Sequence, residues 1–448
     1  MYQNYNHWVS VLFHPSFYLM RHMNISVCNP FNKAHQFSGK KLRMAVMTSV
    51  FALMLPLSTV YAQDKTPAQA TLRPEIIKSL QTLQETLKAK NYESVITLSQ
   101  QALATSNLTP VEKPYVQRIL ASAALESKNF KLAIATLENL IQEMPEKTEP
   151  DQKTGLIESL LSACQQGNDL EKFVKWARVY QDLGGKNKSV RPVLIQALSA
   201  LKQYQDVVTE LKVQLKLDEA NQQKTAESDL RLLAYSQRQL KDDAGYNASL
   251  KLLLQNYPSK AYWAELIPRT ARQANFNARF DLDLYRLLEI TGNLEDTTDY
   301  VEMINLSLKT GLPAEAVRVL EMAYSAGVLG KGSDAASHQK LKHQAQQKLN
   351  EDEKILPTLE KSAKDANAVA SLADVYASQL KWDKAAAAYA KAFELGGLRR
   401  EAETKLHAGI ALFKLGQKAD AQKMWQSIQG DPTALDLAQL WLIWQQAN

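Results

Sequence analysis

Histidines are the first residues to examine for metal or acid–base chemistry, and only His338, His343 and His407 follow residue 62 in this 448-residue chain. His338 and His343 are five positions apart, which places them about 140° apart around a helix, so they are poorly placed to bind one metal ion together. Their neighbours Lys340 and Lys342 are typical of a solvated surface. We therefore predict that these two histidines lie on the surface and form no metal site.

Two further motifs suggest chemistry only weakly. Residues 325–334, SAGVLGKGSD, resemble a phosphate-binding loop, but Ser325 stands where the first glycine is required and no strand is predicted before it. A glycine-rich turn explains this segment with fewer assumptions. Cys164 lies inside the apolar pattern LIESLLSACQQ, which favours a small buried hydrophobe over a nucleophile.

Motifs of the common hydrolases and metal sites do not occur in the sequence: it holds no HExxH, GxSxG or paired CxxC. Its carboxylates are numerous but scattered, as on solvated helix faces, so no general acid and base can be nominated. We predict that the protein is not an enzyme and has no cofactor and no metal.

The elements that position these residues are predicted to be helices. Sixteen glycines and fifteen prolines make up about 7% of the chain, below the roughly 12% of average usage. Apolar residues recur at intervals of three and four, as in Leu80, Leu83 and Leu87. These features predict an all-α protein.

A recurring pattern of small and large residues organises the helices. Tyr376, Ala385, Tyr389 and Ala392 recur 36 residues later as Leu412, Ala421, Trp425 and Ile428. Two antiparallel helices of about 14 residues, with their turns, need roughly 34 residues, and their crossing point accepts only a small side chain. Weaker copies surround Tyr92, Phe130, Tyr204 and Pro313. We predict that the following residues carry this packing: Phe130, Ala133, Ala316, Tyr376, Trp382, Ala385, Tyr389, Ala392, Gly409, Ala421 and Trp425.

On these residues the chain resembles the tetratricopeptide repeat family over most of residues 72 to 446, most clearly in 366 to 433. The resemblance implies a right-handed superhelical solenoid of about nine or ten antiparallel helix hairpins. Residues 260–296, with a proline inside YWAELIPRT, and the Lys/Gln/Glu-rich segment 333–365 depart from the pattern.

The resemblance also implies that the first helix of each hairpin lines a concave groove. Carried onto this chain, the inward positions are Tyr115, Arg118, Arg231, Tyr235, Arg238 and Gln239. Arginine and tyrosine contribute strongly at interfaces, so a peptide with acidic side chains or a free carboxylate fits them. The alternative is that Arg231 and Arg238 are solvated or pair with Asp229 or Asp242. The family's lysine and asparagine clamp for chaperone tails is absent from these positions.

The N-terminus resembles an export signal. Lys40, Lys41 and Arg43 precede an apolar run over 44–60, and the small residue Ala62 follows it. We predict a signal peptide at 40–62, cleaved near Ala62, and a periplasmic protein without membrane insertion after cleavage. An uncleaved anchor is the alternative, but the run is shorter than the roughly 20 residues of a spanning helix.

These features give a domain plan. Residues 1–39 are predicted to be disordered or not translated, and 63–72 form a linker. Residues 73–332 form the main array, 333–365 a long helical connector or irregular hairpin, and 366–448 a repeat pair with a capping helix. Within that last part, Trp441 and Trp444 either complete the cap or anchor a partner.

Net charge limits the partner. The first 62 residues hold five basic residues and no acidic one, so the 53 Lys and Arg fall to 48 against 47 Asp and Glu. Nucleic acid and anionic lipid surfaces require a clustered positive field and are not expected as partners. We predict a Gram-negative periplasmic scaffold for a protein or peptide, in TonB-type envelope transport or in assembly. The alternative is a peptidoglycan or polysaccharide binder, and the oligomeric state stays open.

Overall fold

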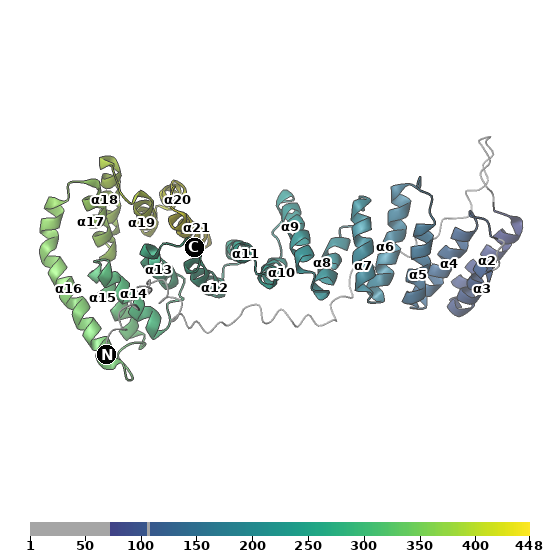
Figure 1. The fold of residues 1–448 in the computed structure, drawn as a ribbon, viewed down its shortest axis with the longest axis horizontal. Helices are drawn as coiled ribbons and strands as arrows, with labels where there is room; N and C mark the ends of the chain where they lie inside the picture. Colours follow the sequence, from purple (N-terminus) through teal and green to yellow (C-terminus); the bar gives the residue numbers. More distant parts are fainter. Residues whose placement is uncertain (1–71, 105–107) are drawn as a thin grey trace, which may run out of the picture. The chain divides into compact units, whose positions relative to one another are not determined.

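Helices and turns account for residues 72–104 and 108–448, the part of the chain that the computed structural model describes, and no strand occurs in these ranges (Figure 1). The all-α helical-repeat fold is therefore confirmed. The predicted upstream segment, the signal peptide and residues 63–71 lie outside the described residues. The described chain divides into two compact units, an N-terminal unit (72–223) and a C-terminal unit (224–448).

In the N-terminal unit, each helix packs against the next along the chain. Its helices are α2 (Pro74–Lys88), α3 (Tyr92–Ala104), α4 (Lys113–Glu126), α5 (Phe130–Gln142), α6 (Pro150–Gln166), α7 (Leu170–Asp182), α8 (Val190–Ala200) and α9 (Tyr204–Ala220). They form the hairpins α2/α3, α4/α5, α6/α7 and α8/α9, as Figure 1 shows.

The C-terminal unit continues the same pattern. Its helices are α10 (Glu227–Gln239), α11 (Asp243–Asn256), α12 (Lys260–Ala271), the 3-10 turn η4 (Ala278–Phe280), α13 (Asp281–Ile290), α14 (Thr297–Lys309), α15 (Pro313–Ser325), α16 (Ala335–Ser362), α17 (Ala366–Ser378), α18 (Trp382–Leu395), α19 (Glu401–Lys414), α20 (Lys418–Gln426) and α21 (Pro432–Ala447). The hairpins are α10/α11, α12/α13, α14/α15, α17/α18 and α19/α20. With those of the N-terminal unit they make nine in the described residues, besides the single helices α16 and α21.

The last helix, α21, does more than follow α20. It packs on α19 and α20 and also on α11 and α13, which precede it by many helices in the sequence. Lys251 of α11 donates to Asp436 and Gln439 of α21 at 3.1 and 2.8 Å. Asn277 donates its backbone N–H to Thr433 at 3.0 Å. Helix α21 therefore connects α11 and α13, near the start of the C-terminal unit, to α19 and α20 near its end.

The small residues of the repeat pattern lie where helices cross. Ala133, Ala316, Ala385 and Ala421 are fully buried, and so is Ala392. Their large neighbours Tyr389 and Trp425 are also buried, whereas Phe130 and Trp382 are half-buried. A small side chain at the crossing lets two helix backbones approach, and the large ones fill the space on either side.

Gly409 on α19 shows why the pattern needs such small residues. A Cβ atom added to Gly409 would lie 2.2 Å from Nε1 of Trp425, far inside contact distance. The indole N–H of Trp425 donates to the carbonyl oxygen of Leu406 at 3.1 Å. Because Gly409 has no side chain, the indole of Trp425 on α20 packs directly against the α19 backbone.

Replacing Ala385 with leucine is expected to destabilise the C-terminal unit by about 1–3 kcal/mol, because three added carbons must enter a fully packed helix crossing. Chemical unfolding followed by circular dichroism measures this. Ala390→Leu on the exposed side of the same helix is the matched control, since alanine and leucine have similar helix propensities. Equal unfolding curves for the two variants would contradict the packing role of Ala385.

Candidate functional site

The predicted groove residues belong to both units. Tyr115 and Arg118 lie on α4 of the N-terminal unit, where Tyr115 is 37% exposed and Arg118 is half-buried. The others lie on α10 of the C-terminal unit, with Arg231 and Tyr235 half-buried and Arg238 and Gln239 exposed. The sequence pattern treats them as one surface, but the structure gives two separate sets.

Arg118 has no hydrogen bond or ion pair with any described residue. Burial lowers the pKa of its guanidinium, and the opposing effect of the adjacent Tyr115 is smaller. A guanidinium that is withdrawn from water without a carboxylate partner is unfavourable, and it presents five N–H donors in a planar fork. The α4 surface therefore offers a cation suited to an external carboxylate.

The other polar residues of α4 are occupied by their own unit. Lys113 donates to Glu143 at 2.6 Å, and Gln117 donates to the second oxygen of the same carboxylate at 3.3 Å. The amide oxygen of Gln117 is buried and accepts no hydrogen bond from the described residues. Glu143 is thus committed to Lys113 and Gln117.

The arginines of α10 have a different environment. Arg231, Tyr235 and Arg238 each already interact with other groups of the structure. Arg231 lies near Tyr262 and Arg238 near Tyr246, since each arginine lowers the pKa of its tyrosine, although burial dominates and raises both. Pairing with Asp229 or Asp242 stays a prediction.

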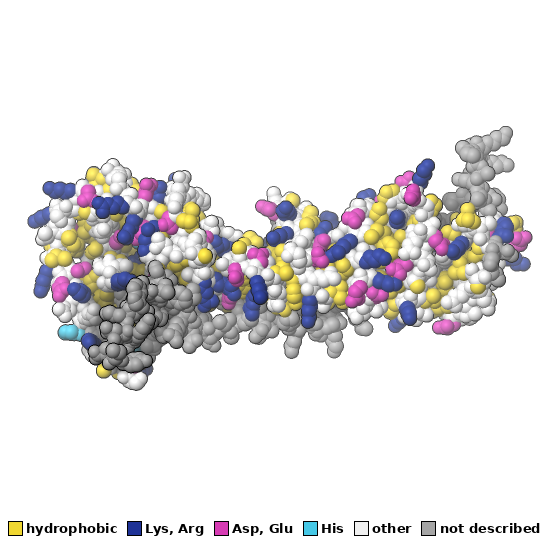
Figure 2. Space-filling view, in the orientation of Figure 1, with side chains coloured by type: hydrophobic (Ala, Val, Ile, Leu, Met, Phe, Trp, Pro, Cys, Tyr) yellow, Lys and Arg dark blue, Asp and Glu magenta, His cyan; other side chains and the backbone are white. Residues whose placement is uncertain are grey.

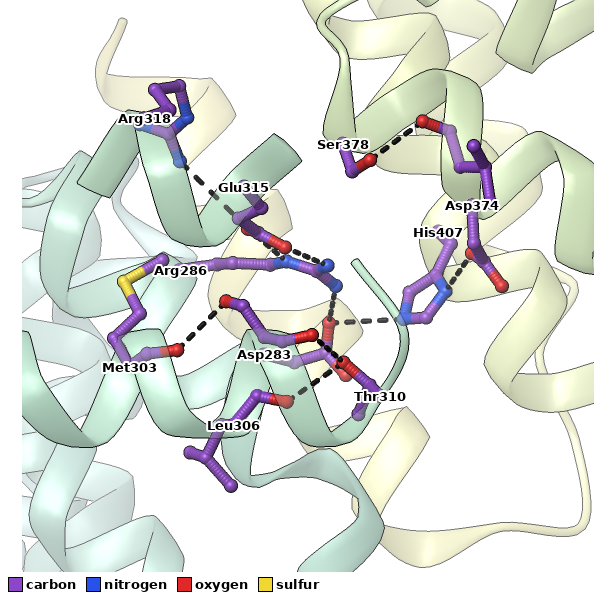
Figure 3. A network of polar contacts seen from close by, with 12 residues as sticks. Asp283, Arg286, Met303, Leu306, Thr310, Glu315, Arg318, Asp374, Ser378 and His407 are labelled. Atoms are coloured by element: carbon purple, nitrogen blue, oxygen red, sulfur yellow. Dashed lines mark hydrogen bonds and ion pairs between the residues drawn. The ribbon is translucent and has the colours of Figure 1, made fainter. Parts of the chain in front are cut away.

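A buried ion network in the C-terminal unit was not predicted from the sequence (Figure 3). We define it as Asp283 and Arg286 of α13, Glu315 of α15, Asp374 of α17 and His407 of α19. Arg286 donates to Glu315 at 2.9 and 2.7 Å and to Asp283 at 2.9 Å. The two ring nitrogens of His407 lie 3.1 Å from Asp283 and 2.8 Å from Asp374. Four helices are joined by these contacts.

The ion network keeps His407 charged. Burial alone would lower the pKa of the imidazole, but the neighbouring Asp283 and Asp374 outweigh burial and raise it well above its ordinary value. For Asp283, burial opposes ionisation, yet His407 and Arg286 bring its pKa below the usual range. The network is therefore made of charged, mutually paired groups.

This arrangement includes an Asp–His pair but does not suit catalysis. Both ring nitrogens of His407 face carboxylates, so both carry a proton and neither can act as a general base. The phenol of Tyr389 donates to Asp374 at 2.6 Å and occupies that carboxylate further. These contacts join α13, α17, α18 and α19, which favours a structural role for the His407 ring.

One prediction about the histidines is wrong. His338 is buried, and its Nδ1 accepts a hydrogen bond at 3.2 Å from the backbone N–H of Gly330, in the turn before α16. His343 is exposed as predicted. Gly327, Gly330 and Gly332 all have positive φ in this segment, which agrees with a glycine turn.

The described residues give no support for chemistry at Cys164 or at a metal site. Cys164 is buried, and burial raises the pKa of its thiol to about 12, so it stays protonated. In residues 72–104 and 108–448, His, Cys, Asp and Glu side chains do not gather into a group of three that could hold a metal ion. Among the described helices, none combines the length and apolar character that a membrane span requires.

The C-terminal tryptophans contact their own chain. Trp441 is buried and stacks on Trp425 with ring centroids 5.9 Å apart. Trp444 packs edge-on against Trp263 of α12 at 6.0 Å. Both side chains therefore help to hold α21 in place.

Comparison with known proteins gives only distant likenesses. No protein-family model matches the chain, and no curated protein matches its sequence. Among solved structures, yeast Tom70 is 12% identical over 83% of this chain and 96% of that chain, with a TM-score of 0.24. The structure of Naa15/Naa10 bound to HypK-THB matches at 12% identity over 83% of this chain and 73% of that one, with a TM-score of 0.23.

A third solved structure is the pentatricopeptide repeat protein PPR10 from maize. It is 14% identical over 81% of this chain, with a TM-score of 0.25, and this chain spans 56% of its length. With scores of this size, the assignment of the fold rests on the helix pairing within the chain itself.

Proposed function

We propose that this chain is a non-enzymatic scaffold that binds a protein or peptide partner along α4 of its N-terminal unit. Arrays of helical hairpins present extended surfaces on which the first helix of each hairpin is available to a ligand. The observation that carries the proposal is Arg118, which is half-buried beside the exposed Tyr115 and has no carboxylate partner in the described structure. A partner with an acidic side chain or a terminal carboxylate supplies the missing charge.

The C-terminal unit contributes less to this function in our proposal. Its arginines on α13 and α15 already hold carboxylates of the same unit, as Arg286 does with Glu315 and Arg318 with Glu289. A partner would have to displace these buried pairs at considerable cost. We propose that this unit acts as a rigid structural support, whose charged groups pair within the unit.

A protein suits this surface better than a nucleic acid. Over the described part of the face seen in Figure 2, Lys and Arg side chains alternate with Asp and Glu. Such a mixture supplies little of the counterion release on which nucleic-acid affinity depends. The glycan-binding alternative has less support, because four of the six tryptophans in the described residues, Trp176, Trp263, Trp425 and Trp441, are buried and so unavailable for stacking on sugars.

We further propose that the scaffold works in the Gram-negative periplasm, in envelope transport of the TonB type or in assembly. The support is the basic and apolar segment that ends at Ala62. Cell fractionation with intact-mass measurement tests it. A mature chain that begins at Gln63 in the periplasmic fraction is the expected result, and a cytoplasmic chain that retains residues 40–62 would contradict it.

The partner site is tested with two double variants of the full chain. Tyr115→Ala with Arg118→Ala is expected to weaken partner binding by about 2 kcal/mol, roughly thirtyfold in Kd, because a rigid aromatic and an arginine are typical hot-spot residues. Arg231→Ala with Arg238→Ala is expected to change it little. Crosslinking in intact cells identifies the partner, and titration with the purified partner measures the affinity.

The control for this experiment is Arg178→Ala, which removes an exposed arginine of the same unit that pairs with Asp206 at 2.7 Å. Circular dichroism shows whether each variant stays helical. If the α10 variant loses the partner and the α4 variant keeps it, the surface is assigned to the wrong unit. Recovery of glycan without any protein would retire the scaffold proposal itself.

A further inference from the structure

Two aspartates, one at the start of α13 and one in the first turn of α14, are buried without an ion-pair partner. Asp281, at the first position of α13, is 4% exposed, and Asp299, in the first turn of α14, is 3% exposed. Neither side chain accepts a hydrogen bond or forms an ion pair with a described residue. One oxygen of Asp299 is completely enclosed and has no partner there.

The charged groups around these two aspartates are mostly acidic. Glu295 and Asp296 act on Asp299, and Glu302 acts on Asp281, for which Lys309 is the one opposing cation among the groups with a resolved effect. No charged group of α12 or α15 has a resolved effect on either carboxyl. Tyr285 lies in the field of both aspartates and also of Asp296 and Glu302.

Burial is the main cause of the resulting shifts, and the neighbouring carboxylates add to it. Together they raise the pKa of Asp299 to about 7 and that of Asp281 to about 6. Asp283 on the same helix is a useful contrast, because it is equally buried but has Arg286 and His407 beside it, which lower its pKa. The difference between these aspartates is the presence of a cation.

We propose that the consecutive helices α13 and α14 form a proton-responsive element, in which the buried and unpaired Asp281 and Asp299 each take up one proton from solvent as the pH falls and thereby stabilise the C-terminal unit. A neutral carboxyl is tolerated in an apolar environment, whereas two uncompensated carboxylates are not. This property goes beyond partner binding and is independent of it.

The direction of the effect follows from linkage. A folded-state pKa above the unfolded one means that stability is greatest at low pH and is lost as the pH rises through the folded pKa. Here the loss runs from about pH 4, near the unfolded pKa, up to about pH 6 for Asp281 and about pH 7 for Asp299. With an unfolded pKa of about 3.9, Asp281 alone changes the ratio of folded to unfolded protein by about tenfold between pH 5 and pH 8.

Other groups of the unit titrate elsewhere or are separable. Burial opposes the charged form of both His407 and Asp283, but their oppositely charged neighbours raise the pKa of His407 and lower that of Asp283, so both groups shift away from the range of Asp281 and Asp299. Glu403 on α19, where burial also raises the pKa, remains in every variant below. Variants of Asp281 and Asp299 therefore separate the effect of these two carboxyls from that of the other titrating groups.

The test is hydrogen exchange of the full chain at pH 5.5 and 8, corrected for intrinsic exchange rates. Peptides covering 281–309 are expected to lose at least about tenfold in protection at pH 8 in the unmodified protein. Asp281→Asn with Asp299→Asn, which mimics the protonated forms, is expected to keep its protection at both pH values. Asp383→Asn, at an exposed position of α18, is the matched control and should behave like the unmodified protein.

The proposal is overturned if the double variant loses as much protection between pH 5.5 and pH 8 as the unmodified protein does. It is also overturned if α13 and α14 of the unmodified protein are equally protected at both pH values. If the double variant does not fold, infrared spectroscopy of the unmodified protein decides. A band of protonated carboxylic acid at pH 5.5, reduced in each single asparagine variant, supports the proposal, and the absence of such a band refutes it.

Discussion

Replacing Arg286 with alanine is expected to destabilise the C-terminal unit by about 3–5 kcal/mol, because it leaves the buried carboxylates of Asp283 and Glu315 without their shared cation. Arg286 is the one residue of the ion network that bridges α13 to α15 by a two-pronged contact. Its pKa is raised well above the ordinary value, since the two carboxylates outweigh the effect of burial. Removing it leaves Asp283 with His407 alone and Glu315 with only the more distant Arg318, so both buried carboxylates lose most of their compensation.

Urea unfolding monitored by circular dichroism measures this loss, and the matched control is Arg178→Ala. Arg178 donates to Asp206 at 2.7 Å, but both partners are about half exposed, so less than about 1 kcal/mol is expected there. If both alanine variants unfold at the same urea concentration, the ion network contributes no more than a surface pair. Arg286→Lys is expected to recover only part of the loss, because an ammonium cannot form the two-pronged contact.

The ion network also illustrates what sequence patterns can and cannot show. Asp283 and His407 are separated by 124 positions, and no motif links them. Charged residues at a helix spacing of three, as in Asp283 and Arg286, are usually solvated, so their burial depends on helices that are distant in the sequence. The available signal was weak: a charged pair inside the apolar stretch DLDLYRLL, and a lone histidine in α19.

The hairpins themselves were predictable because they depend on local periodicity. The 36-residue recurrence placed Ala385 and Ala421 at helix crossings, and both are fully buried. Pro313 begins α15 as expected, since proline at the first turn loses no hydrogen bond. Where the pattern faded, the local rules gave less: Pro268 lies inside α12, and residues Ala335–Ser362 form one 28-residue helix.

The candidate site was predictable only in part. Arg118 and Arg238 were both assigned to inward positions of the repeat, and nothing in their immediate sequence shows that their surroundings differ. What distinguishes them is tertiary: Arg238 is exposed and acts on the buried Tyr246, whereas Arg118 is half-buried without a carboxylate. His338 was misjudged for a similar reason, since its acceptor role depends on the turn that brings Gly330 to it.

Replacing Trp425 with alanine is expected to cost about 3–5 kcal/mol, because the indole is 1% exposed and fills the space between α19, α20 and α21. Its ring lies 6.2 Å from Phe413 and 5.9 Å from Trp441, and its N–H satisfies the carbonyl of Leu406. Gly409, which lies against this indole, has no side chain that could fill the resulting cavity.

The loss should extend to α21, whose Trp441 stacks on the same indole. Because α21 also contacts α11 and α13, we expect hydrogen exchange to increase at those helices as well as at α20 in Trp425→Ala. Trp382→Ala is the control, since Trp382 is only half-buried and packs in a cluster that contains no residue of α21. Increased exchange confined to α20 would show that α21 is held by Lys251, Asn277 and Trp263 rather than by the aromatic stack.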